Sequence, residues 1–376
     1  MEATSTNPNC IAAREIAATH AASASSSSAE PAASTRNASA DLAERAPPSC
    51  NLCGARTSPT LRSVPAVRSC PQCGIASLQN FPDRAGIESF YQDDYYSAET
   101  GARFLKAFEL PFLLFRLLRY WSIARRAQAA RRPADSAPAP GTSTAPPSAP
   151  SLLDVGCGRG DLLQLFQSRG WRALGTQLSR TAAQAARQHR GVEVVCGELP
   201  DLELEPGQFS VITFFHVLEH LPDPAPYLDR AHALLAKGGL LVVEVPDFSA
   251  PGFRVLGERC FCFDHPHHLI FFTPESLRGC LEAHGFHVEA QSRFSLEYSP
   301  YTTLQNWLNA LPGTPNRLYR ALMRNAEARR LRKSPWTWLH AALGGFLAPV
   351  AALVSFGAAL RLWPGNTLRL YCRKQA

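Results

Sequence analysis

Three glycines at alternate positions, Gly156, Gly158 and Gly160, follow a short apolar stretch that contains an acid, Asp154. Glycine has no Cβ, so its backbone N–H group can approach a bound ligand closely. The residues after Gly160 have the pattern of a helix, and a helix N-terminus attracts negative groups. The spacing therefore predicts a loop that binds a nucleotide-like ligand at the carboxyl end of a first parallel strand.

Four cysteines form a second group that could do chemistry, and they occur as two C-x-x-C pairs. Sixteen residues separate the pairs, and a glycine follows each pair. This spacing is typical of a tetrahedral zinc site in which thiolates occupy every position and leave none for a catalytic water. We therefore expect a structural Zn²⁺ ion bound by Cys50, Cys53, Cys70 and Cys73.

A third group reads His-Val-Leu-Glu-His from His216 to His220, which is the inverted zinc-peptidase motif. That motif needs a helix that places both histidines on one face. An apolar strand-like segment precedes this group, and Pro222 and Pro224 end any helix soon after it. The sequence therefore disfavours a peptidase.

The elements that position these residues alternate between strand-like and helical patterns, as in βαβ units. The run Leu-Asp-Val-Gly-Cys-Gly-Arg-Gly at 153–160 resembles motif I of the class I S-adenosylmethionine-dependent methyltransferases better than the dinucleotide fingerprint G-x-G-x-x-G. Segments that resemble the next parts of that fold follow in the family's order: a strand at 172–178, a strand and adenine-side loop at 193–199, a strand at 209–215, and a helix end, turn and strand at 235–246. The resemblance implies an α/β, Rossmann-like sheet of seven strands with an antiparallel last strand at 367–374. It also implies methyl transfer from S-adenosylmethionine.

Two further segments resemble a bacterial subfamily in which a zinc ribbon precedes the catalytic domain. They are Phe-Tyr-Gln-Asp-Asp-Tyr-Tyr at 90–96 and Asp-His-Pro-His-His-Leu-Ile-Phe-Phe-Thr-Pro-Glu-Ser-Leu at 264–277. The resemblance covers about residues 50–100 and 150–295. Sugars, lipids and cell-envelope precursors are the acceptors usually suggested for this subfamily, so it implies a small-molecule or lipid-linked sugar acceptor.

The resemblance also implies which residues contact the cofactor. Gly156, Gly158 and Gly160 would line its methionine and ribose, and Asp154 would order the loop near its amino group. Gln177 stands where the family usually has an acid on the ribose hydroxyls. An amide accepts fewer and weaker hydrogen bonds there, at a cost of about 1 kcal/mol or roughly tenfold in affinity. The other expected contacts are Glu198 and Leu199 beside the adenine and His216 beside the sulfonium.

Methyl transfer mainly requires an acceptor aligned with the S–CH₃ bond and protected from water. A hydroxyl acceptor also benefits from a base with a pKa near neutrality, as histidine has. We expect His216, His265 and His268 as candidates for this base; a structural histidine that caps a carbonyl stays an alternative for each. Some quinone-pathway O-methyltransferases hold a divalent cation with E-x-x-E-H at the position of 216–220. Glu219 and His220 therefore either hold a cation or only shape the acceptor mouth by hydrogen bonding.

Positive charge lies beside apolar sequence in two places. Residues 103–132 contain eight Lys or Arg and one Glu, and residues 317–333 contain seven and one. The second stretch leads into residues 336–360, which carry no charged side chain. Such a pattern attracts an anionic membrane surface. We expect peripheral contact with the inner membrane face. An acceptor lid or dimer surface and a true span stay open as alternatives, although a span would separate residues 367–374 from their sheet.

The remaining composition indicates the organisation of the chain. Residues 1–48 are rich in Ala, Ser and Thr and lack aromatic residues, which is typical of disorder. No secretory pattern begins the sequence and no disulfide framework is evident among its eleven cysteines, so a cytoplasmic protein is expected. The Pro/Ala-rich linker should let the basic helix and the zinc module move relative to the catalytic domain. The expected segments are a leader (1–48), ribbon and connector (49–100), basic amphipathic helix (101–132), linker (133–150), S-adenosylmethionine-binding domain (151–300), hydrophobic helical insertion (301–364) and final strand (365–376).

Three classes of function stay open from the sequence. The favoured class is methyl transfer to a small-molecule, sugar or lipid-linked acceptor. The second is an RNA base methyltransferase that uses the ribbon and the basic stretches, but these contain more aliphatic residues than stacking aromatics, so nucleic acid is disfavoured. The third is a binding protein on a decayed methyltransferase fold, which the amide at Gln177 keeps open.

Overall fold

A computed structural model describes residues 50, 52–53, 55–58, 60–61, 64–79, 109–129, 149–323 and 326–375. These residues belong to one structural unit, Pro47–Ala376. The expected leader (1–48), the aromatic segment at 90–96 and most of the expected linker, 133–148, lie outside the described residues.

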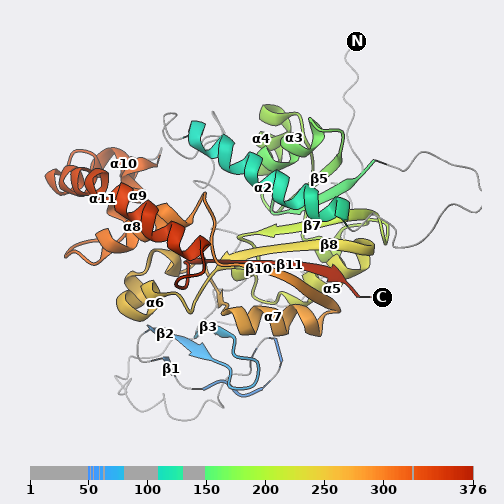
Figure 1. Cartoon of the computed structure of the whole chain (residues 1–376), viewed down its shortest axis with the longest axis horizontal. Helices are drawn as coiled ribbons and strands as arrows, with labels where there is room; N and C mark the ends of the chain where they lie inside the picture. The colour runs from blue at the N-terminus through green and yellow to red at the C-terminus, as the bar shows by residue number, and fades with distance from the viewer. Residues whose placement is uncertain are drawn as a thin grey trace, which may run out of the picture. The chain divides into compact units, whose positions relative to one another are not determined.

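The unit is built around a seven-stranded sheet in the order β6-β5-β4-β7-β8-β11-β10 (Figure 1). The strands are β4 (Ser151–Val155), β5 (Arg172–Gln177), β6 (Glu193–Cys196), β7 (Phe209–Phe215), β8 (Leu235–Pro246), β10 (Phe286–Ser292) and β11 (Thr367–Lys374). Strands β4 to β8 run parallel, whereas β11 lies antiparallel between β8 and β10. This order confirms the expected Rossmann-like sheet with an antiparallel last strand.

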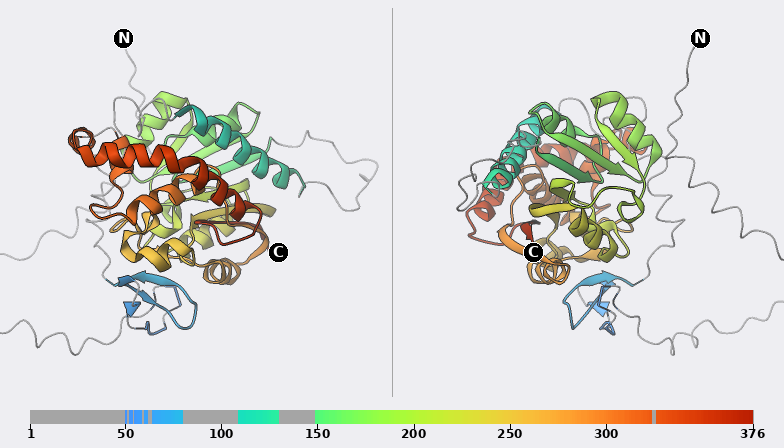
Figure 2. Two further views of the ribbon diagram at one scale, coloured as in Figure 1. Left: turned by 60° about the vertical axis from the view of Figure 1, so that its left-hand side comes forward. Right: turned by 90° about the vertical axis from the view of Figure 1, so that its right-hand side faces the viewer.

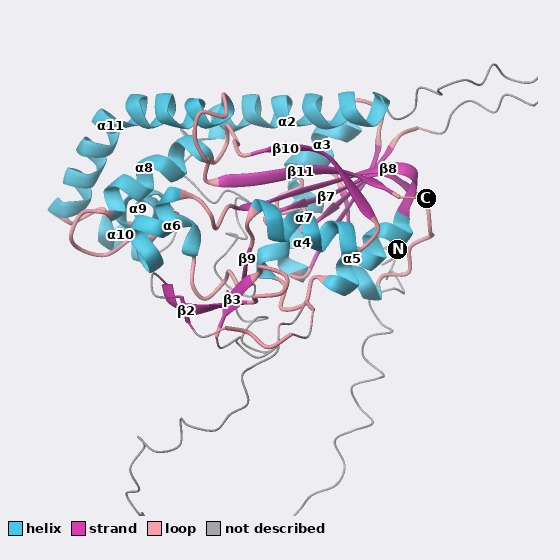
Figure 3. Cartoon of the chain, turned by 60° about the horizontal axis from the view of Figure 1, so that its bottom comes forward, coloured by secondary structure: helices cyan, strands magenta, loops and turns pink. Residues whose placement is uncertain are grey.

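Helices cover both faces of this sheet, because successive side chains of a strand point to opposite faces. The helices up to β10 are α2 (Glu109–Ala129), α3 (Asp161–Gln167), α4 (Arg180–Arg190), α5 (Ala225–Leu234), α6 (Pro251–Leu256) and α7 (Pro274–Ala283). In β4, Leu152 packs in a core with α2, α3 and α4, whereas Leu153 packs in a second core with α5 and α7. Figure 3 shows the helices on either side of the magenta strands.

Helix α2 is docked on the catalytic domain, so the expectation that it moves relative to that domain is wrong. Ile123 is fully buried and belongs to the same core as Phe166 of α3. The hydroxyls of Ser122 and Tyr371 lie 2.7 Å apart, which ties α2 to the last strand. The physical reason is that α2 has an apolar side at helical spacing, and this side covers a sheet face that water would otherwise reach.

The zinc module is likewise joined to the catalytic domain. Strands β1 (Thr60–Leu61), β2 (Val64–Ser69) and β3 (Ala76–Leu78) form an antiparallel sheet that β9 (Ile270–Phe271) extends by pairing with β3. Val67 is fully buried in the larger core of the catalytic domain. In both views of Figure 2 the blue strands lie beside that domain. The expected mobility of this module is therefore wrong as well.

Helices α8 (Ser299–Asn309), α9 (Arg317–Leu322), α10 (Ala326–Leu331) and α11 (Pro335–Ala359) form the expected helical insertion before the last strand. Leu304 and Leu308 of α8 pack against Ala351 of α11. The hydroxyl of Ser355 lies 2.9 Å from that of Thr303, so a buried polar contact joins the same two helices. One face of α11 is thus fixed against the protein.

Candidate active site

The glycine loop connects β4 to α3 and holds a backbone that favours glycine. The φ angles of Gly156, Gly158 and Gly160 are +66°, +56° and +76°. A Cβ built on Gly156 would lie 2.7 Å from a methyl carbon of Val217, and one on Gly160 would lie 2.6 Å from a methyl carbon of Val192. The loop therefore combines left-handed backbone with close packing, as a cradle for a ligand's polar groups requires.

Asp154 lies at the end of β4 beneath this loop and is buried. The hydroxyl of Thr213 in β7 donates a hydrogen bond of 2.5 Å to its carboxylate. Burial raises the pKa of Asp154 to about 6, and the bond from Thr213 only partly offsets this effect. This carboxyl group stands two residues before the first loop glycine.

Gln177 ends β5 and contacts the glycine loop directly, because its amide nitrogen donates to the carbonyl of Gly158 over 3.1 Å. Nothing in the sequence indicated this bond, which a carboxylate could not make. Glu198 follows β6 and accepts a hydrogen bond of 3.3 Å from the hydroxyl of Tyr227, and Leu199 is buried beside it. The expected cofactor contacts thus lie at the carboxyl ends of β4, β5 and β6, which are neighbours in the sheet.

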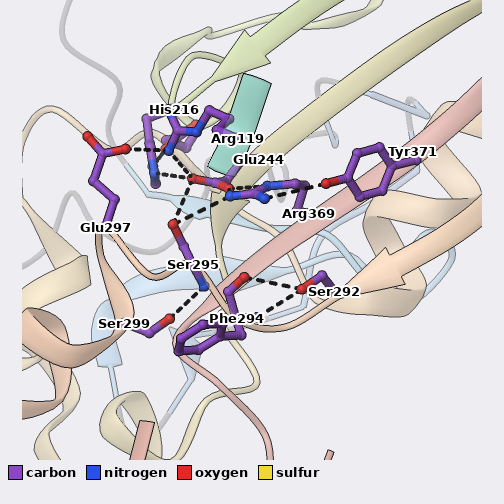
Figure 4. Close-up of polar contacts among 11 residues, drawn as sticks. Arg119, His216, Glu244, Ser292, Phe294, Ser295, Glu297, Ser299, Arg369 and Tyr371 are labelled. Carbon is purple, nitrogen blue, oxygen red and sulfur yellow. Dashed lines mark hydrogen bonds and ion pairs between the residues drawn. The ribbon is translucent and has the colours of Figure 1, made fainter. Parts of the chain in front are cut away.

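His216 follows β7 and lies between two buried carboxylates, of which Figure 4 labels that of Glu244. Its Nδ1 is 3.0 Å from Oε1 of Glu219, and its Nε2 is 3.3 Å from Oε1 of Glu244. Burial lowers the pKa of His216, but the bonds and charges of these two glutamates outweigh it and raise the pKa to about 9. The residue is therefore an imidazolium at neutral pH, whereas the sequence suggested a base with a pKa near neutrality.

Glu244 of β8 is the centre of a charged network that the sequence did not reveal (Figure 4). It pairs with Arg369 of β11 and, over 3.3 Å, with Arg119 of α2. Arg119 also lies 2.7 Å from a carboxylate oxygen of Glu297. Burial raises the pKa of Glu244, but the charges of the two arginines outweigh this effect and hold the pKa well below its usual range. A lone acid within the apolar strand Leu-Leu-Val-Val-Glu-Val-Pro was the one signal of this network in the sequence.

The other histidines expected as bases lie after β8 and differ from one another. His268 is buried, and its Nδ1 donates to the carbonyl of Cys262 over 2.8 Å. Its ring packs edge-to-face on His220 with the centroids 4.7 Å apart. His265 is exposed and stacks on Phe263. The structure therefore places His268 beside the residues that follow β7 and leaves His265 at the surface.

The four cysteines expected to bind zinc come together in the structure. The sulfur atoms of Cys50 and Cys73 lie 3.6 Å apart, and those of Cys53 and Cys70 lie 3.5 Å apart. Thiolates bound to a tetrahedral Zn²⁺ at about 2.3 Å stand about 3.8 Å from one another. The cluster therefore has nearly the spacing that such an ion requires.

The strand order, the glycine loop and the acid beneath it together define a class I S-adenosylmethionine-dependent methyltransferase. Residues 120–291 match a family model described as a methyltransferase domain. The ubiquinone biosynthesis O-methyltransferase of Ralstonia nicotianae is 33% identical over 172 residues, which cover 43% of this chain and 71% of that protein. The chain belongs to the S-adenosylmethionine-dependent methyltransferases.

Other matches are shorter or structural. The ubiquinone biosynthesis O-methyltransferase of Bordetella parapertussis is 42% identical over 94 residues, which are 23% of this chain and 39% of that protein. A solved S-adenosylmethionine-dependent methyltransferase from Archaeoglobus fulgidus aligns with a TM-score of 0.40 at 17% identity and covers 69% of this chain and 94% of its own. The 1,6-didemethyltoxoflavin-N1-methyltransferase of Burkholderia thailandensis aligns with a TM-score of 0.35 at 19% identity, over 61% and 72% of the two chains.

Proposed function

We propose that the protein transfers a methyl group to a hydroxyl of a small-molecule or lipid-linked sugar acceptor in the cytoplasm, at the inner membrane face. The observation that carries this proposal is the position of His216, Glu219 and Glu244. Val217 follows His216 in the chain and packs against Gly156 of the glycine loop. The polar group around His216 therefore lies next to the expected cofactor site. The relatives whose names specify an O-methyltransferase support a hydroxyl as the accepting group.

Bound S-adenosylmethionine supplies an activated methyl group on its sulfonium. The glycine loop would hold its methionine and ribose, Asp154 would face its amino group, and Gln177, Glu198 and Leu199 would surround its ribose and adenine. The carboxylates around His216 would keep that imidazole in one orientation at the acceptor side. The protein has to align the acceptor and exclude water, and polar side chains held in one position beside the acceptor would help to align it.

The test of this function is transfer from labelled S-adenosylmethionine to a cell-envelope lipid extract or to total RNA. We expect the label in the lipid or small-molecule fraction. The His216→Ala variant should lose more than about tenfold in rate with the cofactor still bound, whereas His265→Ala at the surface should lose less. Label in RNA would instead identify the base methyltransferase, and a protein that binds no cofactor would identify the decayed scaffold.

Gln177→Glu should tighten the binding of S-adenosylmethionine about tenfold, because a carboxylate accepts two charge-assisted bonds from the ribose hydroxyls. Isothermal calorimetry measures the change in affinity. Gln177→Ala serves for comparison, because it removes both the expected contact with the ribose and the hydrogen bond to the carbonyl of Gly158. An unchanged or weaker affinity in Gln177→Glu would contradict the ribose contact. The bond from Gln177 to Gly158 would then be the main role of this side chain.

We also propose that the cysteine cluster binds a structural Zn²⁺ ion. All four donors are protein thiolates, so the ion would have no open position for a substrate. The loop that bears Cys70 and Cys73 continues into β3, which pairs with β9 of the catalytic domain. The zinc would therefore stabilise a sheet to which the segment after β8 contributes a strand.

The free face of α11 supports the proposed membrane contact. Phe346 and Leu353 are 78% and 73% exposed, and Trp336 and Trp338 are also exposed. Among the described residues, α11 is long and apolar enough to cross a membrane by length and composition. However, β11 begins a few residues after α11 and lies within the sheet, which argues against a crossing. We propose that α11, which follows the basic segment 317–333, lies in the membrane interface.

The full chain should therefore sediment with vesicles that contain anionic phosphatidylglycerol and much less with neutral phosphatidylcholine vesicles. The double variant Phe346→Ser, Leu353→Ser should reduce the partition coefficient more than about tenfold, because it removes two large apolar contacts. Leu178→Ser, at a partly exposed leucine after β5, is the matched control and should not change it. Equal sedimentation of the double variant and the wild type would contradict the role of α11.

A further inference from the structure

A cavity of about 250 Å³ lies between α6, α8 and the last turns of α11. Helices α8 and α11 lie outside residues 120–291, which match the methyltransferase family model. The cavity therefore depends on the helical insertion of this chain and not on the shared sheet alone. Its lining is mainly apolar and includes Val255, Leu256, Trp307, Val354, Trp363 and Pro364.

The exposed apolar face of α11 leads to this cavity. Phe346, Val350, Leu353 and Leu360 are all exposed, and their spacing of three, four and seven residues places them along one side of a helix. Trp363, three residues after this row, is 42% exposed and lines the cavity. The apolar surface that we propose for membrane contact thus continues to the cavity.

A buried amide adds a hydrogen-bond donor to the apolar lining. Asn306 of α8 is 6% exposed, and its Oδ1 accepts a bond of 2.7 Å from the N–H of Phe261. Its Nδ2 lies on the side of Gly252 in α6, where an added Cβ would come within 2.6 Å of this nitrogen. Both Asn306 and Gly252 line the cavity. A donor within apolar walls suits a hydrocarbon chain that ends in a carbonyl group.

The cavity also lies next to the proposed acceptor site. Ser299, the first residue of α8, lines the cavity. The residue before it is Tyr298, whose ring centroid lies 4.3 Å from that of His216. In addition, α6 follows the carboxyl end of β8, and ligands of open α/β sheets bind at that edge. A lipid with its chain in the cavity could therefore place its head group beside His216.

We propose that this cavity binds the acyl chain of a lipid acceptor, which enters from the membrane along α11. The inference rests on the proposed methyl transfer and narrows the acceptor to a sugar lipid that carries an acyl chain. Burial of methylene groups in the cavity provides affinity, and Nδ2 of Asn306 favours a chain with a carbonyl oxygen. The chain thus anchors the acceptor, whereas the residues around His216 align its hydroxyl.

Binding of cis-parinaric acid to the full chain tests the cavity without methyl transfer. This fatty acid has a straight chain, and its fluorescence rises when the chain leaves water. We expect saturable binding by the wild type. The double variant Phe346→Ser, Leu353→Ser should bind the free fatty acid as well as the wild type does, because it changes the membrane-facing row and not the cavity.

Ala310→Trp and Val255→Trp should each weaken this binding at least about tenfold. Both residues line the cavity and are exposed, so an indole there occupies the space without entering the core. Ala283→Trp, at an exposed alanine that ends α7, is the matched control and should keep the affinity. Circular dichroism checks the fold, and either cavity variant provides the result if the other does not fold.

Transfer of label to the lipid extract separates this inference from the proposed function. The two cavity variants should raise the KM for the extract at least about tenfold and change kcat little. No saturable binding by the wild type, or wild-type affinity in a folded cavity variant, would overturn the chain site. Fatty-acid binding that both variants lose, with no label in any lipid, would support the chain site and overturn the lipid as the acceptor.

Discussion

Gly156→Ala should weaken the binding of S-adenosylmethionine about a hundredfold or more. The φ angle of +66° at this position costs an alanine about 1–2 kcal/mol. Its Cβ would also lie 2.7 Å from a methyl carbon of Val217, so the loop or Val217 has to move. Either movement displaces the N–H groups that approach the cofactor or shifts the segment that begins at His216. A loss of about 2.7 kcal/mol in binding corresponds to the hundredfold change, which calorimetry measures.

Gly170→Ala is the control for this prediction. Gly170 has a φ angle of +80° and no atom within 4 Å of the position that a Cβ would take, and it follows α3 at the end away from the glycine loop. The substitution therefore brings similar backbone strain without a clash. It should lower the free energy of unfolding by about 1 kcal/mol and leave the affinity unchanged. Wild-type affinity in Gly156→Ala would show that the loop does not cradle the cofactor.

The sequence predicted the parts of this fold whose signal is local. An apolar run indicated the boundaries of β7, and the three glycines predicted a close loop at the end of β4. Such elements are specified by short patterns, because a buried parallel strand has to be apolar throughout and a close turn needs glycine. The antiparallel last strand came from the family resemblance, not from its own pattern.

What the sequence could not predict depends on contacts between distant segments. Arg119 and Glu244 are 125 positions apart, and neither has a local pattern that names the other. The same is true of the pairing of β3 with β9, which joins the zinc module to the catalytic domain. The raised pKa of His216 also depends on such a distant contact, because Glu244 of β8 acts on it together with the neighbouring Glu219.

Glu244→Gln should lower the free energy of unfolding by about 3–5 kcal/mol, the largest effect on stability that we expect. The carboxylate is fully buried and pairs with Arg119 and Arg369 while it faces His216. Glutamine keeps the shape but removes the charge, so these cations stay buried with less compensation. Urea unfolding at neutral pH measures the loss.

The control is Glu282→Gln on α7, where an exposed glutamate lies 3.4 Å from Arg278. Solvent screens that pair, so the loss should stay below about 1 kcal/mol. A pH series gives a second check. Because the folded pKa of His216 is raised to about 9 from 6.5, its contribution is complete below pH 6.5 and disappears as the pH rises through 9. In Glu244→Gln this loss should begin at lower pH, since one of the two carboxylates is gone. If the free energy of unfolding falls by less than about 1 kcal/mol in both Glu244→Gln and Glu282→Gln, Glu244 does not stabilise the charged network.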